Sequence, residues 1–195
     1  ALPSGGQPRR NRVPTSIMAG ISRQYRETQE AALDLVDGLT DEQLGWSPNE
    51  TTPSIGFHLW HLARWADYLQ EMIHGRGSQI WERENLAVRW DMATASLGYA
   101  QTGMSMDEKA AMALPLPGKA LLLDYARRAF ELAQQAVASI DDAAFYRVYA
   151  CLHGEDWHDG QIGPIISTWM THDNRHLGMI ECLIGIQGMR GSADS

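Results

Sequence analysis

The chain has 195 residues, of which 44% are hydrophobic and 21% are charged. This composition fits one packed domain and excludes a chain that is disordered throughout. Sixteen basic against 24 acidic side chains give a formal net charge of −8, so we expect no nucleic-acid partner, because the phosphate backbone would be repelled. No apolar run is long enough to span a membrane. With two cysteines there is no disulfide framework, which favours a cytoplasmic location.

We predict one folded domain over residues 15–188, between two flexible ends. Residues 1–14 contain three prolines and three arginines, a composition typical of a flexible N-terminal arm. Residues 189–195 are predicted to form a flexible C-terminal tail.

Apolar residues recur at helical spacing in four long segments. Ser54 and Gly75 are typical residues for the two ends of the second helix, and Pro164 is typical of the first turn of the fourth. No alternating pattern predicts a sheet. The sequence therefore predicts an all-α fold, a four-helix bundle with long covering connections. The long helices are predicted at 17–39, 54–74, 119–140 and 164–186, with a short turn at 41–44 and shorter helices within 81–92 and 107–114.

Two histidines lie one turn apart on the fourth predicted helix. His172 and His176 fall in the middle of its apolar stripe, so both are predicted to point into the bundle. Buried imidazoles are costly unless each ring nitrogen has a partner. A divalent metal supplies such a partner, which makes the pair a candidate metal half-site. The alternative is a pair of hydrogen-bonded core histidines.

The second predicted helix offers His58 and His61 as a third imidazole. On an ideal helical wheel His58 lies roughly 40° from the centre of the apolar stripe and His61 roughly 100°, which slightly favours His58. Three imidazoles would leave an open coordination position, as in catalytic rather than structural metal sites. A simple hydrogen bond to backbone or water is the alternative for either residue.

The two long connections, 76–116 and 141–163, are expected to cover a site. Their aromatic residues are candidates for a substrate cleft, although ordinary packing is favoured. Cys151 and Cys182 are predicted to be small buried residues rather than reactive thiols. The aromatic candidates are Trp81, Trp90, Tyr99 and Trp157.

The segments TPSIGFHLWHLARWADYL and THDNRHLGMIECLIG resemble the DinB-like family of four-helix metalloproteins. The stretches LTDEQLGWSP and WERENLAVRW are also similar, and the resemblance covers residues 17–188. It implies a bundle of the DinB/YfiT type whose metal ligands are His61, His172 and His176. This choice of His61 differs from the periodicity argument.

The same resemblance leaves other residues near the metal as candidates for supporting roles. His58 is a candidate for an alternative ligand or for a residue that hydrogen-bonds to a ligand, and Asp67 and Asp173 are further candidates for these roles. Many relatives carry Glu where this chain has Asp67, which puts acid–base roles in doubt. His176-Leu177-Gly178-Met179 replaces the common His-Arg-Gly-Gln, a change that does not touch the ligands.

Family members include S-transferases that use bacillithiol or mycothiol. The resemblance thus implies one divalent transition metal, zinc first and nickel second, a small-molecule thiol and an electrophilic substrate. The reacting group would be a metal-bound thiolate or water, with no protein nucleophile. A metal-dependent hydrolase without a thiol, a metal-binding stress-related bundle without turnover and a purely structural bundle are the alternatives. A homodimer is a further prediction; no membrane partner is expected.

Overall fold

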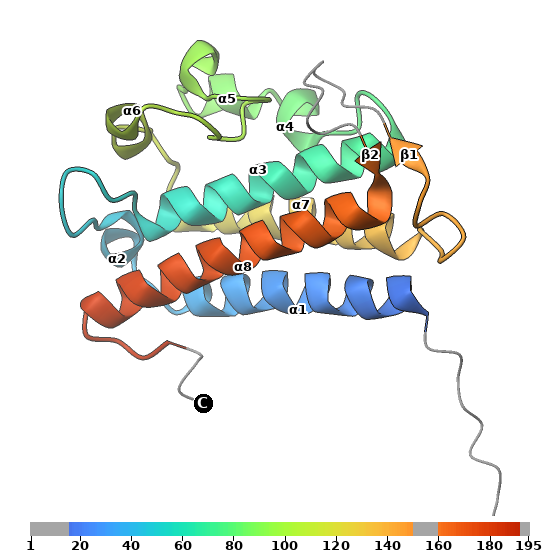
Figure 1. Cartoon of the computed structure of the whole chain (residues 1–195). Helices are drawn as coiled ribbons and strands as arrows, with labels where there is room; N and C mark the ends of the chain where they lie inside the picture. The colour runs from blue at the N-terminus through green and yellow to red at the C-terminus, as the bar shows by residue number, and fades with distance from the viewer. Residues whose placement is uncertain (1–15, 150–159, 192–195) are drawn as a thin grey trace, which may run out of the picture.

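The computed structural model describes residues 16–149 and 160–191. Four long helices form a bundle (Figure 1), which confirms the predicted all-α architecture. Helix α3 packs against α7 and α8, and α1 packs against the same two helices, so α1 and α3 stand at opposite corners. The four helices are α1 (Ile17–Asp37), α3 (Ile55–His74), α7 (Lys119–Ala138) and α8 (Ile162–Ile186).

Side-chain caps fix where the first helices begin. The Ser16 hydroxyl accepts a hydrogen bond from the first turn of α1, and Ser54 does the same for α3. Thr40 and Gln43 form a reciprocal capping box at the start of α2 (Asp41–Gly45). Helix α8 begins two residues earlier than predicted, which leaves Pro164 in its first turn, where no backbone N–H is needed.

Helix α3 is buried on every side rather than along one stripe. Every residue from Ile55 to Met72 is buried, because the connection after α3 folds back over the helix face that the bundle leaves open (Figure 1). The single helix predicted over 81–92 is wrong. Asn85 adopts a left-handed φ of 52° and divides the segment into two short helices. The connection contains α4 (Ile80–Arg83), α5 (Leu86–Arg89), the 3-10 helix η1 (Thr94–Ser96) and α6 (Glu108–Met112).

A two-stranded antiparallel ladder joins the ends of the second long connection. Strand β1 (Val148–Tyr149) pairs with β2 (Gly160–Gln161), with Val148 opposite Gln161. The sequence predicted no sheet, since two residues are too few to show alternation. In the described ranges, no helix has the length and apolarity needed to cross a bilayer. The predicted arm, 1–14, and most of the predicted tail lie outside the described residues.

Candidate metal centre

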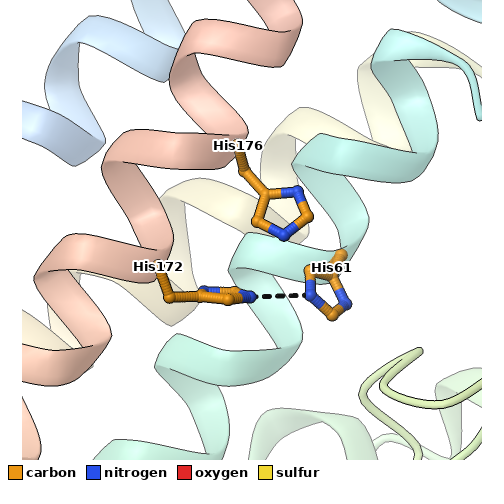
Figure 2. A group of neighbouring side chains, drawn as sticks. All are labelled: His61, His172 and His176. Carbon is orange, nitrogen blue, oxygen red and sulfur yellow. Dashed lines mark hydrogen bonds between the residues drawn. The ribbon is translucent and has the colours of Figure 1, made fainter.

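Three histidines from two helices converge inside the bundle. His61 lies on α3, and His172 and His176 lie one turn apart on α8. One ring nitrogen from each lies within 4.8 Å of the other two. Figure 2 shows the three rings turned toward a common space between the helices. The structure thus brings together the residues that the family resemblance assigned to a metal.

Hydrogen bonds at Nδ1 orient two of the rings. The Nδ1–H of His61 donates to the main-chain carbonyl of Thr102, an oxygen that can only accept. Nδ1 of His172 lies 3.2 Å from Oδ1 of Asp173, a carboxylate that also accepts. Both rings therefore carry their proton on Nδ1 and leave Nε2 as a lone pair, the arrangement usual for metal-binding histidines.

The two Nε2 atoms of His61 and His172 face one another at 3.0 Å (Figure 2). With the ring protons on Nδ1, no hydrogen is left to bridge these two nitrogens, and two lone pairs at this distance repel. A cation between them removes the repulsion, and the nitrogen of an imidazole is a preferred ligand of divalent transition metals. The donor set therefore fits a metal ion.

Burial keeps the imidazoles of His58, His61 and His176 neutral, which is the form that binds a metal. Loss of solvation lowers the pKa of His61 to about 3 and that of His176 to about 2. It also lowers the pKa of His58 to about 4. Neighbouring histidines push the pKa of His61 and His176 further in the same direction. At neutral pH His58, His61 and His176 therefore each have a lone pair available.

His58 lies beside the cluster rather than in it. Its Nδ1 is 2.9 Å from Nδ1 of His176, so one ring donates and the other accepts. If His176 donates, its Nε2 is free to face His61 and His172, as in Figure 2. His58 thus holds a position from which it orients a ring of the cluster.

The two candidate carboxylates have different surroundings. Asp173 is 4% exposed and lies against His172, and burial raises its pKa. The sequence placed His172 and His176 at the centre of the apolar stripe, yet both are half-buried and Asp173 is buried instead. Asp67 accepts hydrogen bonds from Arg64, from Tyr125 and from the first turn of α4, which places it in a separate network.

The Thr102 carbonyl sits in a tight loop that the sequence analysis did not single out. Gly103 has a φ of +89°, and a Cβ there would meet Trp60 at 2.7 Å and His61 Nδ1 at 2.9 Å. The buried guanidinium of Arg64 donates to the carbonyls of the two residues preceding Thr102, at 3.0 and 2.9 Å. The position of a main-chain carbonyl in such a loop leaves no periodic pattern in the sequence, so periodicity could not predict it.

A pocket of about 490 Å³ opens beside the cluster, with His172 in its wall. Trp65 and Trp169 line it, and their ring centroids are 5.1 Å apart. Of the predicted cleft aromatics, Trp81 packs against Arg64 in the interior instead. The other residues that line the pocket are Met104, Thr168, Thr171 and Arg175.

Only one of the two cysteines, Cys182, lies among the described residues. Cys182 on α8 is exposed, which contradicts the prediction that it is buried, because the face of α8 at that position is turned to solvent. Cys151 and Trp157 lie outside the described residues.

Comparison with known protein families supports the resemblance found in the sequence. A family model described as the DinB superfamily matches residues 24–180. Among solved structures, a conserved protein from Enterococcus faecalis is similar, with a TM-score of 0.65 and 15% sequence identity. The match covers 87% of this chain and 98% of that chain, and at this identity it shows the fold alone. No curated protein matches the chain.

Proposed function

Because the chain belongs to the DinB superfamily and its three imidazoles can hold a divalent metal, we propose that it is a metal-dependent S-transferase. It would join a low-molecular-weight thiol of the bacillithiol or mycothiol type to a small electrophile. The observation that carries the proposal is the pair of facing Nε2 atoms in His61 and His172, 3.0 Å apart, together with the apolar pocket that His172 lines.

His61, His172 and His176 would hold the metal, with zinc the first choice and nickel the second, since both accept imidazole ligands. When bound, the metal supplies an open position at which the pKa of a thiol or water is lowered. His58 and Asp173 keep the rings of His176 and His172 turned inward. The protein thus provides a donor set whose rings are held in a fixed orientation.

The lining of the pocket supports a nucleophile that arrives with a cosubstrate. Among the described residues no cysteine lines the pocket. The hydroxyls of Thr168 and Thr171 each donate to a carbonyl of their own helix, one turn back, and are not activated by a base. Trp65 and Trp169 give the pocket an apolar wall, which suits the carbon skeleton of an electrophilic substrate.

The experiment compares three proteins loaded with zinc: the natural chain, His172→Ala and His74→Ala. His74 is an exposed histidine at the end of α3 and serves as the matched control. Thiol conjugation to a chlorinated or epoxide substrate is followed, and bound zinc is measured separately. We expect one zinc per chain and metal-dependent conjugation in the natural chain and in His74→Ala.

His172→Ala should lose both zinc affinity and conjugation by more than about 100-fold, since loss of a hydrogen bond to a ligand alone costs 10–100-fold. Equal conjugation rates with and without zinc would refute the proposal. Metal-dependent hydrolysis of an ester without thiol would instead identify a hydrolase.

A further inference from the structure

The pocket beside the histidine cluster carries a positive charge with no acidic neighbour in its wall. Arg175 lines the pocket, and none of the lining residues within the described chain is Asp or Glu. The net charge of the whole chain is −8, so the sign of the pocket is opposite to that of the protein. Such a local reversal selects an anion that the rest of the surface repels.

Arg175 shares one face of α8 with three other lining residues. Thr168, Thr171, His172 and Arg175 follow one another at positions i, i+3, i+4 and i+7. Arg175 lies three residues past His172, roughly 4.5 Å along the helix axis. Because Arg175 and His172 line the same pocket, a group bound by the guanidinium shares that pocket with one histidine of the cluster.

The guanidinium of Arg175 forms no ion pair with a carboxylate of the described chain, although it is exposed to solvent. Two arginines of α7 show the contrast: exposed Arg127 pairs with Asp37, and half-buried Arg128 pairs with Glu84 and Asp124. A planar guanidinium without a carboxylate partner presents a fork of donors that matches a carboxylate in both shape and charge.

The rest of the pocket is suited to an apolar group. Trp65, Trp169 and Met104 surround it, and its volume of about 490 Å³ lies within the range usual for small-molecule sites. Aromatic walls favour a flat or aromatic body through stacking and edge contacts. The pocket thus combines one anion-binding end with one apolar wall.

We propose that the electrophilic substrate is an organic anion, an arylalkyl carboxylate or a compound of that chemistry. Arg175 binds the carboxylate, and Trp65 and Trp169 contact the apolar body. This assignment rests on the proposed function only in treating the bound anion as the substrate of S-transfer. Binding of the anion itself depends on the pocket alone.

The test uses 3-phenylpropanoate and its uncharged analogue 3-phenylpropanamide as probes, and follows the quenching of tryptophan fluorescence. The zinc-loaded and the metal-free protein are both titrated, because a carboxylate could also bind to zinc. We expect the carboxylate to bind at least about tenfold more tightly than the amide in both forms, the usual size of one charged hydrogen-bonded contact.

Arg175→Gln should abolish this preference in both forms, and Arg175→Lys should keep part of it. Arg26→Gln, which removes one positive charge from the exposed face of α1, should keep all of it. Equal affinities for the two probes, or a preference that survives in Arg175→Gln, would overturn the proposal. A preference present with zinc and absent without it would also overturn it, since the anion would then be bound by zinc.

A failure of the Arg175 proposal can be distinguished from a failure of the proposed S-transferase function. The titration contains no thiol, and one arm contains no metal. A protein that binds the anion through Arg175 but does not conjugate it contradicts the S-transferase proposal alone. A protein that conjugates neutral electrophiles and shows no preference for the anion contradicts the Arg175 proposal alone.

Discussion

Helix α3 contributes to two polar clusters, one around Arg64 and one around His61, and the two differ in one respect. In the first, all five N–H groups of Arg64 have an acceptor. In the second, His61 and His172 face one another with two lone pairs. The acceptors of Arg64 are Asp67, Gln79, Tyr125 and the carbonyls of Ala100 and Gln101.

This difference separates a structural role from a functional one. A buried polar network is stable when each donor meets an acceptor, and the Arg64 network meets that condition while it ties the covering connection to α3. The histidine cluster does not meet it until a cation is added. Incomplete pairing in a buried cluster is thus the sign of a binding site, and the predictions below test that distinction.

The largest expected effect is that of Asp67→Asn on folding. The substitution leaves the charge of buried Arg64 without its carboxylate partner, and loss of one partner of a buried ion pair costs about 3–5 kcal/mol. Urea unfolding of the metal-free protein measures it. The folded variant should still bind one zinc per chain, and a loss of zinc without a loss of stability would reverse the roles assigned to the two clusters.

A smaller effect is expected for Asp173→Asn, and it should fall on metal affinity rather than on folding stability. The carboxylate orients His172 through its Nδ1, and removal of such a contact lowers metal affinity 10–100-fold, about 1.4–2.7 kcal/mol. Zinc affinity is measured by competition with a chelator. Because the Asp173 charge is buried and its pKa is raised, stability of the metal-free protein should not fall; a loss comparable to that of Asp67→Asn would contradict this.

Lowering the pH should gradually reduce the folding stability of the metal-free protein. Burial lowers the pKa of His58 and His61 to about 4 and about 3 in the folded state, against about 6.5 when unfolded. Between these values the unfolded chain binds more protons, so stability is present above pH 6.5 and falls as the pH is lowered. Each histidine contributes about 1.4 kcal/mol per pH unit.

Urea midpoints at pH 7, 6 and 5 measure this slope. His58→Gln should reduce the change of stability with pH by the contribution of one histidine. His74→Gln, at an exposed position, should leave this slope unchanged. Bound zinc should flatten the slope. A slope that is the same in His58→Gln as in the natural chain would show that this imidazole is not buried in its neutral form.

The helices were predictable because their apolar spacing and their caps are local properties of the sequence. Ser54 and the run after it define α3 within a residue. The faces were less predictable: α3 is buried all round, and α8 is turned so that Asp173 is buried while His172 borders the pocket. A wheel assumes one partner, whereas α8 packs against both α1 and α3.

The histidines show the same limit at the level of single residues. Periodicity slightly favoured His58, and the motif resemblance favoured His61. The structure puts His61 in the cluster and His58 against His176. Neither line of reasoning indicated the role of Arg64, because its partners come from a connection that has no periodic pattern.

The hydrogen bond that orients His61 ends on a main-chain oxygen, that of Thr102. No exchange of the side chain at position 102 deletes that oxygen, so the tautomer of His61 tolerates sequence drift there. Position 103 does not tolerate such a change, because the Cβ of any other residue would clash with the imidazole of His61. The orientation of His61 therefore depends on the path of the main chain at 102–103, and a search for proteins with a similar site should look for that path as well as for the three histidines.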